Sequence, residues 1–194
     1  MIIGPVIDKY GDCIGFNIED SWQGSKVFTW HLDGGSFDPK EKKNNYWKNG
    51  NKKLDPNGDE WISEWKKWSE FCRFSGEGLR RRCKTEKKDK CINPNIPVFS
   101  YYRDQRLSYV EARKKMYIPW YAELVKDTRS FKYLKERFDI GISLIILDPD
   151  GQNRDIEILK LNKENMKEKI NDKNFIFGHG FVLGCVLLNI NVWD

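Results

Sequence analysis

The sequence contains no apolar run near the roughly 20 residues that a membrane-spanning helix requires. Its opening residues, 1–8, turn polar too soon for a secretory signal peptide. These two absences predict a cytoplasmic protein without a membrane segment. The chain also has no CxxC pair, and its five cysteines are odd in number. We therefore expect free thiols rather than a disulfide framework.

The spacing of the cysteines does not favour a metal site. Cys72, Cys83 and Cys91 could form a zinc knuckle together with His31 or His179. Their positions in the sequence match no common zinc pattern, in which two ligands usually lie two to four residues apart. We expect no structural metal, and no cofactor is implied by the sequence.

The composition describes a globular chain. Its 194 residues are enough for one domain with a sizeable core, and 39% of them are hydrophobic and 32% charged. Eight Trp, eight Tyr and eleven Phe predict a core, and any pocket, rich in aromatic rings. We expect one domain, 1–194, with surface insertions near 34–58 and 76–97, where turn-forming or basic residues gather. The abundance of Lys and Asn is typical of a phage or an AT-rich bacterium.

The net charge of +5 is concentrated in basic loops, most clearly at Arg80, Arg81 and Arg82. The pI near 8.8 falls below the level typical of a dedicated DNA-binding domain. These loops are either solvated surface or a means of attracting a phosphorylated or nucleic-acid partner over long range.

Hydrophobic patterns predict a mixed fold. Short strands are expected at 2–7 and 98–102, and a strand covered on both faces at the aliphatic run 140–148. Helices are expected at 19–30, 60–73, 103–127, 131–138 and 182–188. Pro119 should kink or break the longest helix at Ile118. The predicted class is α/β or α+β, mostly helical with a small central sheet.

The helix at 60–73 carries a tryptophan stripe. Trp61, Trp65, Trp68 and Cys72 recur at the spacing of one helix face. Such a stripe is usually part of a core, and the alternative is a pocket wall that stacks on a base.

The first helix carries the main candidate site. A helix over 19–30 places Glu19, Gln23, Lys26 and Trp30 on one face, while Trp22 points elsewhere and can bury the helix against a core. An acid, an amide and a base flanked by rings could bind a small polar ligand. The alternative is an ordinary solvated polar face.

Two later residues are further candidates. Asp148 ends the predicted strand 140–148, where α/β proteins commonly place site residues, although it could equally belong to a turn. His179 lies between two glycines at a predicted helix start. That setting lets a ligand approach the backbone and favours an anion, while a structural histidine is the alternative.

The pattern Glu19-x-x-Trp22-Gln23-x-x-Lys26 resembles the signature helix of the NADAR (YbiA-like) family of N-glycosidases. Leu183-Gly184-x-x-Leu187 is similar to a late motif of that family. Arg103 and Arg113 fall roughly where the family has an Arg-rich central helix. The chain departs from the pattern at Asp20, where the family commonly has His, and around Phe181, where the family's Trp-Gly and Asn have no counterpart.

The resemblance implies a YbiA-like fold and cleavage of an N-glycosidic bond in an ADP-ribosyl or nucleotide-type compound, without a metal or cofactor. Such bonds break through an oxocarbenium-like centre that a carboxylate can stabilise. The implied catalytic residues are Glu19, with His179 or Asp148 protonating the leaving base. The implied substrate-binding residues are Gln23, Lys26, Trp22, Trp30, Arg103 and Arg113.

Two other hypotheses remain open. The departures at Asp20 and Phe181 favour a non-catalytic nucleotide-binding protein, acting as a sponge or sensor. The basic loops allow a nucleic-acid or protein interaction module that works through Arg80, Arg81 and Arg82.

Overall fold

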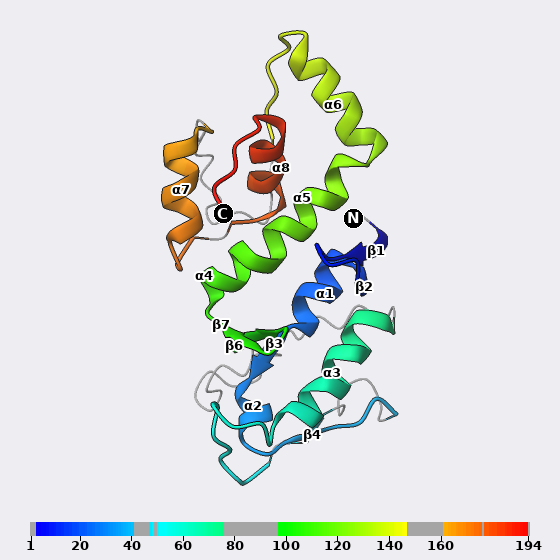
Figure 1. Cartoon of the computed structure of the whole chain (residues 1–194), viewed down its shortest axis with the longest axis vertical. Helices are drawn as coiled ribbons and strands as arrows, with labels where there is room; N and C mark the ends of the chain where they lie inside the picture. Colours follow the sequence, from blue (N-terminus) through cyan, green and yellow to red (C-terminus); the bar gives the residue numbers. More distant parts are fainter. Residues whose placement is uncertain are drawn as a thin grey trace, which may run out of the picture. The chain divides into compact units, whose positions relative to one another are not determined.

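The computed structural model describes residues 3–40, 47–48, 50–75, 97–146, 161–175 and 177–193. They form two compact units: an N-terminal unit from Ile3 to Ser108, and a C-terminal unit that begins at Tyr109. Helices and small antiparallel sheets make up the chain, which confirms the mixed α+β class (Figure 1). The single-domain organisation stays a prediction. None of the described helices has the length and apolar character needed to cross a bilayer.

The strands of the N-terminal unit pair in three antiparallel sheets. The pairs are β1 (Ile3–Ile7) with β2 (Cys13–Asn17), β4 (Ser36–Phe37) with β5 (Trp47–Lys48), and β6 (Pro97–Tyr102) with both β3 (Lys26–Phe28) and β7 (Gln105–Leu107). The strands expected at 2–7 and 98–102 are confirmed. The β4–β5 pair lies inside the segment 34–58, so this expected loop contributes to a sheet.

The long helix was expected to begin at residue 103, but a turn between β6 and β7 lies there instead. Arg103 and Asp104 have φ angles of +47° and +59°, and Tyr102 pairs with Gln105 across them. Positive φ at both central residues matches the twist of the flanking strands in a two-residue hairpin. Residues 103–107 therefore form a hairpin, and helix begins only at Tyr109.

The helix expected over 19–30 is also shorter than predicted. Helix α1 (Ile18–Gly24) is followed by β3 and then by the single turn α2 (Thr29–Leu32). Val27 and Phe28 are buried, and β3 pairs with β6. Branched and aromatic side chains fit a buried strand well, and long-range pairing with β6 outweighs the local helical pattern.

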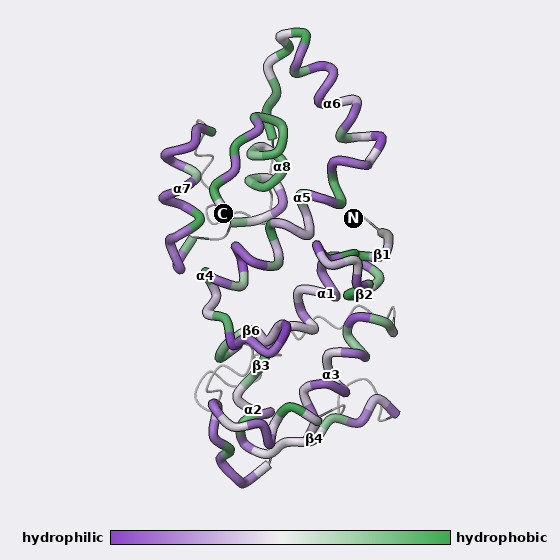
Figure 2. Tube along the Cα trace, in the orientation of Figure 1, coloured by the Kyte–Doolittle hydropathy of each residue, from purple (hydrophilic) through white to green (hydrophobic). Residues whose placement is uncertain are grey.

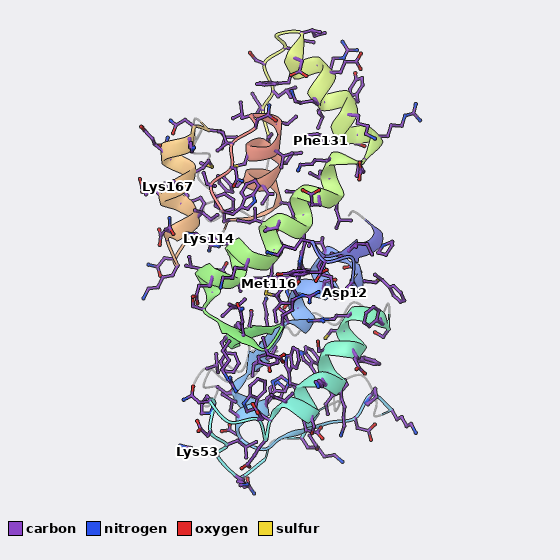
Figure 3. All side chains as sticks on the ribbon, in the orientation of Figure 1. Asp12, Lys53, Lys114, Met116, Phe131 and Lys167 are labelled. Atoms are coloured by element: carbon purple, nitrogen blue, oxygen red, sulfur yellow. The ribbon has the colours of Figure 1, made fainter. Side chains whose placement is uncertain are left out.

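Helix α3 (Ile62–Phe74) confirms the helix predicted at 60–73. The tryptophan stripe is buried in the core of the N-terminal unit, so the core interpretation holds. Figure 3 shows many side chains crowded between α3 and the strands of this unit. The buried members of this cluster are Val27, Phe28, Trp30, Leu32, Phe37, Trp61, Trp65, Trp68, Cys72 and Tyr101. Several of the rings meet edge to face, the geometry that aromatic quadrupoles favour.

The elements assigned in the C-terminal unit are helices. They are α4 (Tyr109–Ala112), the π-helical turn η1 (Arg113–Tyr117), α5 (Ile118–Lys126), α6 (Arg129–Asp139), α7 (Lys163–Asn171) and α8 (His179–Leu187). Helix α5 packs against α6 and α8. Figure 2 shows that α8 is almost wholly apolar whereas α7 is mostly hydrophilic. The helices predicted at 131–138 and 182–188 are confirmed, and Tyr133 on the first of them is exposed.

The sequence predicts a kink or a break at Ile118, and the structure has instead a π-helical turn just before this residue, with helix on both sides of it. The N–H of Ile118 donates to the carbonyl of Arg113, five residues back, and Pro119 occupies the first turn of α5. Proline has no N–H and is tolerated at a helix start. The wider π turn thus allows helical structure to continue through the proline.

The buried strand expected at 140–148 is wrong over its described part, 140–146. Helix α6 ends at Asp139, and Gly141 just beyond it has a φ of +88°. The N–H of Gly141 donates to the carbonyl of Phe138, and the N–H of Ile142 donates to the carbonyl of Arg137. This arrangement is a glycine-terminated helix end. Ile140 and Ile145 are 68% and 83% exposed. The aliphatic run is therefore a helix end followed by exposed, irregular chain.

Asp8 links the β1–β2 hairpin to the β6–β7 hairpin of the N-terminal unit. Its carboxylate accepts hydrogen bonds from the backbone N–H groups of Tyr10 (2.9 Å) and Asp12 (3.1 Å), from the Tyr102 hydroxyl, and from the Arg103 guanidinium (2.8 Å). Burial of the carboxylate would raise its pKa, but the donors outweigh burial and lower the pKa of Asp8 to about 2.

We predict that Asp8 makes stability depend on pH in the acid range. A carboxyl whose pKa is lowered by folding stabilises the protein above its unfolded pKa, and this contribution is lost as pH falls through the folded value. Between pH ~4 and ~2 the free energy of unfolding should fall by on the order of 2 kcal/mol more for the wild type than for Asp8→Asn. Urea denaturation at several pH values measures this difference. Glu60→Gln, which changes an exposed acid, should follow the wild type.

Candidate functional site

The first turn of α1 determines which of its two acids is available. The Asn17 side chain accepts the Asp20 backbone N–H (2.8 Å) and donates to the Asp20 carboxylate (2.5 Å). Asp20 is 6% exposed, and Ser21 donates to the carbonyl of Asn17 (2.7 Å). Asn17 is thus the N-cap of α1. Because Asp20 is used in starting the helix, Glu19 is the acid left for other contacts.

Glu19, Gln23 and Lys26 form one hydrogen-bonded chain. The Gln23 side-chain amide donates from Nε2 to Glu19 Oε1 (2.6 Å), and its Oε1 accepts from Lys26 Nζ (2.9 Å). The first link joins residues four apart on α1, as predicted. The second is made differently, because Lys26 belongs to β3 and reaches back to the helix. The structure therefore brings these three side chains together.

The Lys26 ammonium is poorly solvated. Burial lowers the pKa of Lys26 to about 8, and the negative charge of Glu19 offsets only part of this effect. The ammonium also lies 5.1 Å from the centre of the Trp22 ring, within range of a cation–π interaction. Lys26 is consequently a cation at neutral pH that loses its charge only slightly above it.

The two tryptophans predicted to stack on a base lie in different surroundings. Trp22 is buried on α1 beside the Lys26 ammonium. Trp30 is 2% exposed and lies in the core, where its ring stacks on His31 at 3.6 Å and meets Trp68 edge to face at 6.0 Å. Trp22 is therefore next to the hydrogen-bonded chain, whereas Trp30 contributes to packing.

Arg103 belongs to the Asp8 cluster. Its guanidinium forms ion pairs with Asp8 and Asp12 and lies 3.9 Å from the centre of the Tyr10 ring. These contacts give Arg103 a role in holding the hairpins together. In the part of the chain that the structure describes, Arg103 makes no hydrogen bond or ion pair with Glu19, Gln23 or Lys26.

Arg113 caps a helix from the inside of the C-terminal unit. It is 1% exposed, and its guanidinium donates to the carbonyls of Lys169 (3.2 Å), Ile170 (3.1 Å), Asp172 (3.2 Å) and Phe175 (2.6 Å). The last carbonyls of a helix lack partners within it. Arg113 supplies hydrogen-bond donors to the carbonyls at the end of α7 and in the residues that follow it.

His179 is the first residue of α8 and is exposed. Its ring meets Tyr121 at 4.6 Å and Tyr117 at 5.6 Å between centroids, both edge to face. His179 belongs to the C-terminal unit and Glu19 to the N-terminal unit. The geometry within each unit does not join the two residues in one site.

Other predicted residues lie outside the described residues. They are Asp148, the basic cluster Arg80, Arg81 and Arg82, most of the expected insertion 76–97, and Cys83 and Cys91. Their roles stay predictions. The described cysteines, Cys13, Cys72 and Cys185, are free thiols.

Two surface hollows lie elsewhere. One, of about 390 Å³, is in the N-terminal unit and is lined by Phe37, Lys48 and Glu64 among others. The other, of about 330 Å³, is in the C-terminal unit beside Phe131, Cys185 and other residues. Neither is lined by a residue of the predicted site, so the hydrogen-bonded chain rather than a deep pocket defines the candidate site.

Arg73 is a charged residue that the sequence patterns did not single out. Its side chain lies against Gly24, the residue that follows Gln23. Arg73 lies in the last turn of α3, half-buried, with its guanidinium 5.9 Å from the Trp65 ring. A signal was present: Trp65, Ser69 and Arg73 recur every four residues, and the first two are buried. An arginine on the buried stripe of a helix could have been noticed on that basis.

We predict that Arg113 is a structural residue. Arg113→Met should lower the free energy of unfolding by about 3 kcal/mol, because it leaves buried carbonyls without donors. Amide hydrogen exchange should show the loss concentrated at α7. Lys114→Met, on the same π-helical turn, should leave that exchange unchanged. Normal protection of α7 in Arg113→Met, together with weaker ligand binding, would contradict the structural role.

Comparisons of the chain with protein-family models, with curated proteins and with solved structures give no match. A functional assignment therefore depends on the geometry above and on the short motif Glu19-x-x-Trp22-Gln23-x-x-Lys26. Of the residues in that motif, the structure connects Glu19, Gln23 and Lys26 by hydrogen bonds and sets Trp22 against the Lys26 ammonium.

Proposed function

We propose that this protein is an N-glycosidase that hydrolyses an ADP-ribosyl or nucleotide-type N-glycoside. The observation that carries the proposal is the continuous hydrogen-bonded chain Glu19–Gln23–Lys26. It places a carboxylate, an amide and a poorly solvated ammonium side by side on the N-terminal unit. The proposal agrees with the resemblance of this motif to the NADAR signature.

Glu19 supplies the carboxylate that the reaction needs. Hydrolysis breaks the bond between C1′ and the base nitrogen, adds the oxygen of water to C1′, and transfers a proton to the departing base. Positive charge develops at C1′ in between, and a carboxylate stabilises it or orients the water. The Gln23 amide holds Glu19 Oε1, while no described residue donates to Oε2. Oε2 is then the atom that faces C1′ or the water.

Gln23 and Lys26 set up the rest of the site. Gln23 uses one N–H for Glu19 and its oxygen for Lys26, which leaves its second N–H for a ribose hydroxyl or the base. The Lys26 ammonium uses one of its three donors for Gln23, and the remaining two can bind a phosphate or carbonyl oxygen. Trp22, beside this ammonium, is the aromatic ring best placed to contact a base.

A second candidate function is binding of the same class of ligand without turnover. The observation in its favour is that Asp20, which stands where the resembling family commonly has His, is used by Asn17 at the helix start. A sensor or sponge needs the Gln23 and Lys26 donors but no group that protonates the base.

We predict that Glu19→Gln abolishes turnover. The amide keeps the size of the side chain but removes the charge that stabilises the ribosyl centre, so hydrolysis should fall by about 10²-fold or more. Release of free base from ADP-ribosyl and nucleotide N-glycosides, followed by chromatography, measures the rate. Glu70→Gln, an exposed acid on α3, should be as active as the wild type. Equal activity of Glu19→Gln and wild type would refute this mechanism, and ligand binding without any base release favours the sensor.

We also predict an alkaline limit set by Lys26. Its pKa of about 8 means that the cation is present at lower pH and is lost as pH rises through that value. If the cation binds substrate, kcat/KM should decline above pH ~8, since this parameter reports groups of the free enzyme. Lys26→Arg should keep its charge and shift the decline to higher pH. An unchanged pH profile in Lys26→Arg would remove Lys26 from substrate binding.

A further inference from the structure

A surface hollow of about 330 Å³ in the C-terminal unit has no part in the function proposed above. It lies between the chain that ends α8 and the corner that joins α5 to α6. Its volume falls within the range of roughly 300–1,000 Å³ typical of sites for small ligands. The residues that line it are Lys126, Phe131, Lys135, Cys185, Val186, Asn189, Ile190, Asn191 and Trp193.

The end of α8 forms one wall of the hollow. Asn189 has a φ of +54°, and the N–H groups of Asn189 and Ile190 donate to the carbonyls of Val186 (3.2 Å) and Cys185 (2.8 Å). These two hydrogen bonds define a Schellman helix end, in which asparagine can take the left-handed position. The chain after α8 consequently runs back beside the helix (Figure 1), and Trp193 lines the same hollow as Cys185.

The corner between α5 and α6 forms another wall. The Thr128 hydroxyl donates to the carbonyl of Val125 (2.8 Å) and accepts the N–H of Phe131 (3.1 Å). One side chain thus binds the end of α5 and the first turn of α6. This arrangement holds Phe131, the buried residue of α6, in the wall of the hollow.

The floor of the hollow is apolar and uncharged. Phe131, Cys185 and Val186 are each at most 8% exposed. Burial raises the pKa of the Cys185 thiol to about 11, so this thiol is neutral at physiological pH. Ile190 and Trp193 add an aliphatic and an aromatic side chain. Such a floor favours the apolar part of a ligand, because contact removes apolar surface from water.

The rim of the hollow carries positive charge. Lys126 and Lys135 line it, and among its described lining residues none is Asp or Glu. Each lysine pairs along its own helix with an acid outside the hollow, Lys126 with Glu123 (2.8 Å) and Lys135 with Asp139. Both acids are more than half exposed. Exposed ion pairs of this kind stabilise a protein little, so a bound anion can compete with them.

We propose that this hollow binds a small organic acid, with the apolar body of the ligand on the floor and its carboxylate at Lys126 and Lys135. One carboxylate is the complementary charge, because the acids along each helix already offset part of the charge of the two lysines. Asn189, which also lines the hollow, has a side-chain amide that can donate to the same group. The proposal does not rest on the N-glycosidase function, since the hollow shares no residue with the chain Glu19–Gln23–Lys26.

The experiment is an NMR titration of the full chain with 4-phenylbutyrate and, separately, with its uncharged amide. The signals to follow are the methyl groups of Val186 and Ile190 and the indole N–H of Trp193. We expect 4-phenylbutyrate to shift these signals with a Kd below about 1 mM. The amide should bind at least about fivefold more weakly, because it forms no charge-assisted hydrogen bond with a lysine.

Lysine variants test the contribution of charge. Lys126→Gln and Lys135→Gln should each raise the Kd for 4-phenylbutyrate at least about threefold. Lys132→Gln is the matched control, because Lys132 is an exposed lysine of α6 that does not line the hollow. It should bind like the wild type. Thermal denaturation of each variant checks that its fold is unchanged.

The other outcomes contradict the proposal. Absence of any shift, equal affinity for the acid and the amide, or unchanged affinity in Lys126→Gln and Lys135→Gln overturns it. Shifts centred on the exposed side chains of Ile140, Ile142 and Ile145 would show adsorption to apolar chain outside the hollow. Shifts of the hollow's signals with protein concentration alone would show that a second copy covers it. Either of these two results also rejects a site for a small acid.

Discussion

Helix α1 and helix α3 approach each other so closely that glycine is required where they meet. A Cβ at Gly24 would lie 2.9 Å from the Arg73 side chain and 3.0 Å from the carbonyl of Ser69. At Gly15, in the strand before α1, a Cβ would lie 2.2 Å from the Ser21 hydroxyl. The close packing at these two positions therefore depends on glycine.

The same approach explains why the candidate site has unusual electrostatics. Apolar rings from α3 and β6 pack against β3 in the core. The Lys26 side chain on this strand is therefore shielded from water on the side that faces the core. Amides and the helix cap supply neutral or already occupied partners there. Glu19 is the acid whose charge acts on the Lys26 ammonium, and Gln23 lies between the two side chains.

Features that depend on neighbours in the sequence could be predicted. The tryptophan stripe at 60–73, the helix at 131–138 and the apolar helix at 182–188 are all local patterns, and each is confirmed. In the candidate site, the contact between Glu19 and Gln23 is of this kind, because four residues span one turn of helix. These patterns reach only as far as the next turn.

Features that depend on distant residues could not be predicted. The pairing of β3 with β6, which ends α1 early, joins Lys26 to Ser100. The carbonyls that Arg113 caps come from residues 56 to 62 positions later. The aliphatic run 140–146 matched a buried strand in composition, yet no described strand pairs with it. Arg73 meets Gly24 only once α1 and α3 have packed, so this contact was not visible in the sequence.

The π-helical turn η1 has a consequence for the surfaces of the helical rod from Tyr109 to Lys126. A π turn holds one residue more than the α-helical path between the same points, and each residue of an α-helix corresponds to a rotation of about 100°. The faces of α4 and α5 are therefore offset by about one residue's rotation from those of a continuous α-helix. Arg113 opens the π turn and points to the α7 end, while α5 directs its own apolar side to α8. Because of the one extra residue, the helical segment 109–126 can direct Arg113 to the end of α7 and the apolar face of α5 to α8.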